Sequence, residues 1–544
     1  MMNQIRSLSL LAFAATVMVF ALSCKGDDRN EEVPSSETLS ILPYYSTIDF
    51  SSDGTTAIAN GKSINPTFTV TTSEASWNVA LNPSSLWLSW SKENDNTFSL
   101  TAEANEGATP SPTVTVTVTG IKAQPITFTV TQGGYDQIPS YDESLFMHIG
   151  AFDMVFDVKK IQEVAVAGFT LLIPGESQVN FGINASSALQ FMDYAQAFGL
   201  KVSVHDRDFC EYIFDSALGG ITTYKPANNK NVHLYKDHPA FYGMNLCDEP
   251  QADQFNLVKQ KLNEFRAEFP NDKLGCVNIN PYRTGFYSAW VDNYMNTVQP
   301  SFLSYDDYAM FADGSVRNSY LQVMSFIKNK AMQYGVPAHQ YILTVGHVGE
   351  SAYRSPSLED LRWQIACLMT YGYEWFTHYN ISGYGANPET MWNNNGTTNA
   401  LYEKVKTVNL EVHDWDHVYM SFLEGWEGVT PINGSSGSTD NFFSLLLISG
   451  YFKTGNIGGI NSIASVENIL VGEFKDKDNR KGFMITNATN PYNKKSTTVT
   501  IKFENSYSRL LVYEFGKPKV YDLDEQQGIT LAFEPGEGKF VIPF

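Results

Sequence analysis

Short runs in which apolar and polar residues alternate fill residues 46–132, and polar turns separate these runs. Val and Thr dominate the runs, as in residues 67–71, 113–118 and 126–131. Alternation with a period of two places every second side chain on one face of a strand, and β-branched residues favour strands. The pattern predicts an N-terminal β-sandwich over residues 46–134.

Beyond residue 141, short apolar runs alternate with longer amphipathic runs. The longer runs carry apolar residues at helical spacing, for example in residues 187–198, 316–334 and 358–370. Eight shorter runs are predicted to be strands: residues 145–152, 170–174, 201–205, 241–246, 274–280, 302–308, 341–346 and 373–379. Eight strand–helix repeats predict a (β/α)8 barrel, the TIM-barrel fold, over residues 141–424.

The pattern returns to short strands in the last part of the chain. The clearest of these are residues 468–474, 481–486, 498–503, 510–514 and 538–542. Polar turns separate them, which predicts a C-terminal β-sandwich over residues 425–544. We therefore expect a multidomain protein in which a barrel lies between two β-sandwiches in the chain.

The first 24 residues are typical of a targeting segment. Arg6 supplies a basic start, and the apolar run of residues 8–20 is too short to span a bilayer comfortably. The residues that follow, Ala-Leu-Ser before Cys24, resemble a bacterial lipobox, which implies a lipoprotein signal peptide with Cys24 as the lipidated residue. The alternative is an ordinary secretory signal with a chance cysteine.

Residues 25–45 read as a charged tether from the lipid to the first domain. Their acidic start, residues 25–32, resembles the tag that directs Bacteroidetes lipoproteins to the outer surface. The resemblance implies a protein anchored by its N-terminal lipid in the outer membrane and exposed at the cell surface.

Composition narrows the classes of partner. The formal net charge of −21 argues against nucleic acid, whose phosphates require a basic face. Aromatic residues make up 13% of the chain, which suits sugar rings but also large cores. The remaining cysteines show no CxxC spacing, so we expect buried free thiols and no disulfide framework: Cys210, Cys247, Cys276 and Cys367. No clustered ligand spacing predicts a metal site.

Four short motifs in the first predicted sandwich resemble a BACON domain. They are Ser-Trp-Asn-Val at 76–79, Trp-Leu-Ser at 87–89, Ala-Asn at 104–105 and Val-Thr-Gln-Gly at 130–133. Their order and spacing match that family over most of residues 46–134. The resemblance implies an immunoglobulin-like module that binds carbohydrate or serves as a spacer in surface proteins that degrade glycans.

Two adjacent acids, Asp248 and Glu249, follow the fourth predicted barrel strand and precede Pro250. Side chains at the carboxyl end of a barrel strand face a ligand rather than the core. Neighbouring carboxyl groups disfavour each other's ionisation, so one of them can hold a proton near neutral pH. Glu249 is therefore a candidate proton donor. The alternative is that these acids cap the helix that follows.

The order of sandwich, barrel and sandwich, with an acid pair at the end of the fourth strand, resembles the clan A glycoside hydrolases. The resemblance implies that Glu249 is the catalytic acid/base and that Glu350, beyond the seventh strand, is the nucleophile. The sequence departs from the clan at two points. Asp248 stands where the clan usually has an Asn that contacts the sugar, and Glu350 lies several residues past the predicted strand end.

Other polar residues near the ends of predicted strands complete the candidate site. Asp306 and Asp307 compete with Glu350 for the role of second carboxyl, and Tyr308 is placed to hydrogen-bond a nucleophile, as the resemblance implies. The predicted substrate-binding residues are Asp248, His205, Asn278, Asp306, Tyr308 and Trp375, the last as an aromatic platform for a sugar.

These features predict a glycoside hydrolase that cleaves a poly- or oligosaccharide outside the cell. Such cleavage needs one carboxyl to protonate the leaving oxygen and another to attack or to activate water, without a metal or organic cofactor. The resemblance favours retention of configuration. The alternative is a surface protein that binds glycans on a TIM-barrel scaffold without catalysis.

Overall fold

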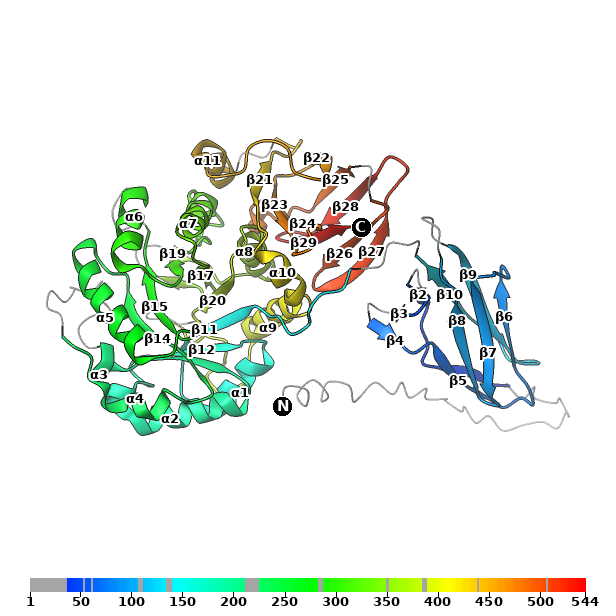
Figure 1. The fold of residues 1–544 in the computed structure, drawn as a ribbon, viewed down its shortest axis with the longest axis horizontal. Coiled ribbons are helices and arrows are strands. Elements are labelled where there is room, and N and C mark those ends of the chain that lie inside the picture. Colours follow the sequence, from blue (N-terminus) through cyan, green and yellow to red (C-terminus); the bar gives the residue numbers. More distant parts are fainter. Residues whose placement is uncertain are drawn as a thin grey trace, which may run out of the picture. The chain divides into compact units, whose positions relative to one another are not determined.

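The computed structural model describes residues 37–51, 54–59, 62–105, 111–133, 139–210, 225–281, 287–348, 352–383, 389–437, 440–504 and 507–544 (Figure 1). The chain divides into two compact units, Met1–Pro139 and Ser140–Phe544. Each unit has its own hydrophobic core. No helix within the described ranges is long and apolar enough to cross a lipid bilayer.

The first unit consists of two facing sheets. A four-stranded sheet has the order β1 (Leu39–Leu42), β5 (Thr67–Thr72), β8 (Thr97–Ala102), β7 (Leu88–Asn94). A six-stranded sheet has the order β4 (Lys62–Ile64), β3 (Ala57–Ala59), β2 (Thr47–Phe50), β10 (Ile126–Gln132), β9 (Ser111–Thr119), β6 (Asn78–Asn82). Its strands pair antiparallel, except that β2 and β10 run parallel.

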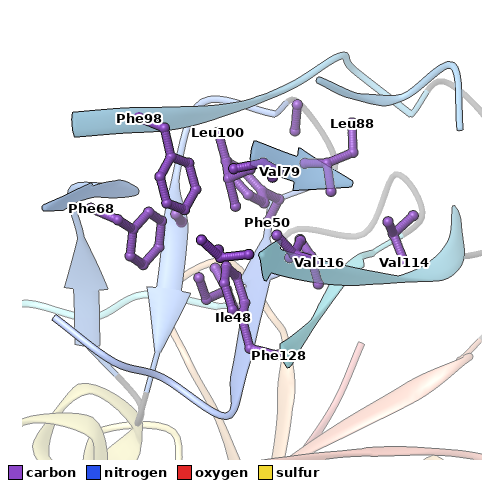
Figure 2. Packing of buried hydrophobic residues seen from close by; sticks show 14 of the residues in the cluster. Ile48, Phe50, Phe68, Val79, Leu88, Phe98, Leu100, Val114, Val116 and Phe128 are labelled. Atoms are coloured by element: carbon purple, nitrogen blue, oxygen red, sulfur yellow. The ribbon is translucent and has the colours of Figure 1, made fainter. Parts of the chain in front are cut away.

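The alternation in the sequence accounts for the core of this unit. In β9, Val114, Val116 and Val118 are fully buried while the residues between them face outward. Phe68 of β5 stacks on Phe98 of β8 with ring centroids 5.0 Å apart. These side chains meet between the two sheets (Figure 2). The predicted N-terminal β-sandwich is therefore confirmed as a fold, although β1 begins within the predicted tether.

The second unit contains a closed barrel of eight parallel strands with helices around it (Figure 1). The strands are β11 (His148–Met154), β12 (Leu171–Pro174), β13 (Lys201–Val204), β14 (Phe241–Asp248), β15 (Leu274–Ile279), β16 (Leu303–Asp306), β17 (Ala338–Leu343) and β20 (Trp375–Tyr379). β20 pairs with both β17 and β11, which closes the barrel. The predicted (β/α)8 fold is confirmed.

Helices and short elements connect and cover these strands. The helices are α1 (Val158–Val166), α2 (Phe181–Ala197), α3 (Arg207–Cys210), α4 (Val232–Tyr235), α5 (Phe255–Glu268), α6 (Tyr287–Val298), α7 (Tyr320–Tyr334), α8 (Leu358–Thr370), α9 (Ala400–His413) and α10 (Asp416–Leu423). The short elements are η4 (Asn229–Asn231), η5 (Ala252–Gln254), and the paired strands β18 (His347–Val348) and β19 (Ala352–Tyr353).

The start of α8 illustrates how the sequence sets a helix end. The Ser357 hydroxyl accepts a hydrogen bond from the backbone N–H of Asp360 at 3.1 Å, and the Asp360 carboxylate accepts one from the Ser357 N–H at 3.0 Å. This capping box satisfies two backbone donors that have no partner within the helix. Arg354 pairs with the same carboxylate at 2.8 Å, so the segment before α8 is tied to its first turn.

The C-terminal part of the second unit is a β-sandwich, as predicted. Its larger sheet has the order β21 (Gly428–Ile432), β23 (Ile469–Lys475), β24 (Lys481–Asn487), β29 (Gly538–Pro543), β26 (Arg509–Glu514), β27 (Lys517–Asp522). The smaller sheet has the order β22 (Ile460–Ser465), β25 (Thr497–Phe503), β28 (Gly528–Phe533). The helix α11 (Asn441–Ser449) and the short helix η6 (Pro491–Asn493) lie in the connections.

Hydrogen bonds between side chains and backbone carbonyls join the sandwich to the barrel, among them one at the end of α8 and one after β16. The Trp426 indole N–H donates to the carbonyl of Thr370 at the end of α8, at 3.0 Å. The Asn490 amide, just before η6, donates to the carbonyl of Gly314 in the loop after β16, at 2.9 Å. The sandwich thus contacts segments that follow β16 and β17, two strands that carry site residues.

Candidate active site

Glu249 lies directly after β14 in an unusual backbone conformation. Its φ is 44°, in the left-handed region that residues other than Gly seldom adopt. Its N–H donates to the carbonyl of Asn278 at 2.8 Å, so pairing with the next strand holds this conformation. Backbone strain of this kind costs roughly 1–3 kcal/mol and concentrates at functional sites. The chain keeps a glutamate where a glycine would be relaxed.

A second acid at the same end of the barrel has the same property. Asp153 has a φ of 61° and lies where the pairing of β11 with β12 shifts register. Burial raises the pKa of its carboxyl. Sequence reasoning did not single out Asp153, because a bulge near a strand end leaves no clear signature in the pattern.

Asn278 joins two carboxyl groups from neighbouring strands. Its amide nitrogen donates to Asp248 Oδ1 at 3.2 Å and to Asp306 Oδ1 at 2.8 Å. In the sheet, Asn278 pairs with Asp248 on one side and with Ser304, two residues before Asp306, on the other. Three of the predicted site residues therefore lie together at the carboxyl ends of β14, β15 and β16.

Asn280 extends this arrangement to Glu249. Its amide nitrogen donates to Glu249 Oε1 at 3.0 Å. Asn280 was not among the predicted site residues, but the strand period of two would have found it, since it follows Asn278 by two positions. We call Asp248, Glu249 and Asp306, with the two asparagines that bind them, the carboxyl cluster.

The cluster strongly perturbs Asp306. Burial raises the pKa of this carboxyl well above its usual range, and the charges of Glu249 and Asp248 raise it further. The hydrogen bond from Asn278 acts in the opposite direction. Asp306 thus favours its protonated form at a pH where an isolated aspartate is ionised. A carboxyl cluster that retains a proton is suited to general acid chemistry.

The neighbouring Asp307 has a different role. Its carboxylate is buried and pairs with Arg317 Nε at 3.0 Å. Arg317 also donates to the carbonyl of Tyr308 at 3.0 Å, so the pair secures the segment after β16. Of the two adjacent acids that the sequence offered as competitors, Asp306 joins the cluster and Asp307 forms a structural ion pair.

Three aromatic rings stack in series beside the cluster, and we call them the aromatic wall. Tyr308 stacks on Tyr379 with centroids 4.8 Å apart, and Tyr379 stacks on Phe152 at 5.4 Å. All three side chains are half-buried. The pKa of the Tyr308 hydroxyl is raised by burial and then by the charge of Asp306, which places this ring next to the cluster. Tyr308 was predicted; Phe152 and Tyr379 were not.

His347 was also missed by the sequence reasoning. It lies in β18, beyond the end of β17, and packs edge-on against Tyr308 at 5.8 Å and at a tilt against Tyr353 at 4.7 Å. Burial lowers the pKa of its imidazole. Because two-residue strands such as β18 and β19 have no recognisable period, only the fold brings this histidine to the aromatic wall.

Trp375 and His205 are the two remaining predicted residues in the described part of the chain. Trp375 opens β20 at its amino end and packs on His339 at 5.4 Å and on Phe302 at 5.0 Å, away from the carboxyl ends of the strands. His205 directly follows β13 and is buried, with Nε2 3.5 Å from the amide nitrogen of Asn245. Burial lowers its pKa to about 4, so this imidazole is neutral near pH 7.

Two predicted functional residues, Glu350 and Cys24, lie outside the described residues. Their roles as nucleophile and lipidation site stay predictions. The four cysteines of the barrel are free thiols, as predicted.

No protein-family model and no curated protein matches the chain. Similar solved structures include a family 39 glycoside hydrolase from Bacteroides cellulosilyticus, at 10% identity and a TM-score of 0.41, covering 83% of this chain and 91% of that chain. A family 5 xyloglucanase from Bacteroides ovatus has 15% identity, a TM-score of 0.30, and coverage of 69% and 100%. An endo-β-1,4-mannanase from Thermotoga petrophila has 10% identity, a TM-score of 0.36, and coverage of 72% and 97%.

Proposed function

We propose that this chain is a glycoside hydrolase that cleaves a glycosidic bond in a poly- or oligosaccharide outside the cell, with Glu249 as its acid/base. The observation that carries the proposal is the carboxyl cluster at the carboxyl ends of β14 to β16. In (β/α)8 enzymes the chemistry takes place at this end of the barrel.

The cluster supplies the proton that glycosidic cleavage requires. Because the folded barrel raises the pKa of Asp306, the group of acids around Glu249 keeps a proton that isolated carboxyls would release. Glu249 donates a proton to the leaving oxygen, and Asn280 orients its carboxyl for that step. The second carboxyl in a retaining reaction is Glu350.

The aromatic wall supports a carbohydrate as substrate. A sugar presents an apolar face of C–H groups that packs on aromatic rings, while its hydroxyls bind polar groups. Tyr308 and Tyr379 combine a ring with a hydroxyl beside the carboxyls of the cluster. With the predicted lipid anchor at Cys24, the proposed setting is the outer membrane, facing glycans at the cell surface.

A panel of purified glycans tests the proposal. The wild-type protein should release reducing ends from at least one glycan, and Glu249→Gln should bind the same glycan but release none. Asp253→Asn serves as the matched control, because it removes an exposed acid four residues away without touching the cluster. Binding of a glycan without release by the wild type would favour the alternative of a non-catalytic binding protein.

A further inference from the structure

A chain of hydrogen bonds runs through the barrel interior and ends at the carboxyl cluster. Thr377 Oγ1 lies 2.9 Å from His339 Nε2, His339 Nδ1 lies 2.9 Å from Ser304 Oγ, and Ser304 Oγ lies 2.9 Å from Asn278 Oδ1. The four residues come from β20, β17, β16 and β15, and all four are buried. We call this series the interior chain.

The hydrogen-bonding capacity of each group determines the direction of the chain. Asn278 uses its NH2 group for Asp248 and Asp306, so its oxygen faces Ser304 and can only accept. The Ser304 hydroxyl therefore donates its single proton to Asn278 and accepts from His339 Nδ1. The thiol of Cys276 also lies against Ser304, but sulfur is a weaker acceptor than an amide oxygen.

This direction fixes the tautomer of His339. Burial lowers the pKa of its imidazole to about 3, so the ring is neutral and carries one N–H. That N–H is on Nδ1, and Nε2 accepts from the hydroxyl of Thr377. Gly150 of β11 leaves room for this contact, because a methyl group at that position would overlap the Thr377 hydroxyl.

The orientation of the Asn278 amide determines whether Asp248 and Asp306 have a hydrogen-bond donor. If the Asn278 amide turned over, its oxygen would face the oxygens of Asp248 and Asp306, and the two carboxyls would lose their shared donor. In that orientation the Ser304 hydroxyl would have to accept from the NH2 group and donate to His339 Nδ1, and the imidazole would have to carry its proton on Nε2. The orientation of Asn278 is therefore coupled to the tautomer of His339, and the Nδ1–H tautomer favours the orientation in which Asn278 donates to both carboxyls.

We propose that His339 is a positioning residue that sets the protonation of Asp306 through Ser304 and Asn278. A role of His339 in hydrolysis rests on the proposed function, whereas its effect on the protonation of Asp306 does not depend on that function. His339 touches neither carboxyl, and Trp375 and Phe302 pack against its ring from the side of β20 and β16.

The groups around Asp306 allow a clean readout. Asp248 and Glu249 face it from β14, Tyr341 faces it from β17, and Asp307 and Tyr308 adjoin it on its own segment. Burial raises the pKa of both tyrosines, and of the Cys276 thiol near Asp248 to about 12, so none of these three groups titrates below pH 8. These three groups therefore do not contribute to a readout below pH 8.

Two variants of His339 distinguish the role of Nδ1 from that of Nε2. His339→Asn places an amide nitrogen where Nδ1 lies and keeps a donor for Ser304, whereas His339→Gln places its amide where Nε2 lies and loses that donor. Urea unfolding between pH 3.5 and 8 measures the effect. In His339→Gln, Asp306 loses a hydrogen-bond donor to its charged form, so its pKa in the folded state should rise. The pH range over which stability falls with rising pH should then extend upward by about one pH unit. His339→Asn should follow the wild type.

Ser304→Ala provides a second break in the interior chain without a change at His339, and should show the same upward shift. In an Asp306→Asn background the shift should vanish in both variants, because the titrating group is gone. Curves for His339→Gln and Ser304→Ala that run parallel to the wild type would overturn the proposal. Where a glycan is hydrolysed, the pH optimum should move with the stability window. Absence of hydrolysis would count against the proposed function and leave the stability result intact.

Discussion

Replacing Asp306 by Asn should stabilise the protein at neutral pH. Asparagine keeps an oxygen that can accept the 2.8 Å hydrogen bond from Asn278 but cannot ionise. In the wild type the folded state raises the pKa of Asp306, through burial and through the charges of Glu249 and Asp248. The folded state therefore resists the loss of a proton that the unfolded chain releases readily.

The sign and the magnitude follow from proton binding. Above the ordinary aspartate pKa of about 3.9, the unfolded chain has lost this proton while the folded state retains it. The free energy of unfolding of the wild type then falls with rising pH, by at most about 1.4 kcal/mol per pH unit, until Asp306 ionises in the folded state as well. The free energy of unfolding of Asp306→Asn does not fall in this way. The variant should therefore be no more stable than the wild type below a pH of about 3.9, and its extra stability should grow as the pH rises above that value.

Urea unfolding followed by fluorescence measures the effect at a series of pH values, since urea adds no ionic strength. Asp307→Asn is the matched control. It breaks the ion pair with Arg317, which is buried on the aspartate side, and should destabilise the protein by about 3 kcal/mol at pH 7. Replacing these two adjacent aspartates by asparagine should thus change the free energy of unfolding at pH 7 in opposite directions. An advantage of Asp306→Asn that stayed constant or shrank with rising pH would refute the reasoning.

Three further predictions concern single positions. Glu249→Gly should be more stable than Glu249→Ala by about 1 kcal/mol in chemical denaturation, because only glycine relaxes at a φ of 44°; the usual order, with alanine ahead, would contradict a strained backbone there. Tyr379→Ala should weaken glycan binding in calorimetry by about 2- to 10-fold through loss of ring stacking, while Tyr379→Phe should keep most of the affinity; equal losses would assign the effect to the hydroxyl. Gly150→Ala should lower stability by about 1–3 kcal/mol through overlap with Thr377, and a neutral effect would mean that the interior has more room than the contacts indicate.

The order of the elements was predictable because the patterns are long and regular. The boundaries were less so where polar residues enter the barrel. The seventh strand was predicted to begin at Tyr341, but β17 begins at Ala338 and includes His339 and Gln340. These polar residues look like a loop in the sequence. In the fold they are buried, because His339 finds its partners on β16 and β20.

The candidate site was predictable only in part. Strand alternation indicates that Asp306 and Asp307 point in opposite directions, but it does not tell which one faces inward. Alternation likewise indicates that Trp375 and His378 lie on opposite faces of their strand, but not which of them faces the barrel interior. The height of Trp375 along the barrel depends on the pairing of β20 with β17, where Trp375 lies opposite His339 at the amino end. Such register between distant strands leaves no trace in a local pattern.

The most direct test of the central claim compares initial rates of reducing-end release by the wild type and Glu249→Gln, on a glycan that the wild type cleaves. Loss of a positioned proton donor lowers a rate by about 10²- to 10⁴-fold. We therefore expect Glu249→Gln to be at least about 100-fold slower than the wild type at saturating substrate. A rate within a few-fold of the wild type would show that the proton comes from another group.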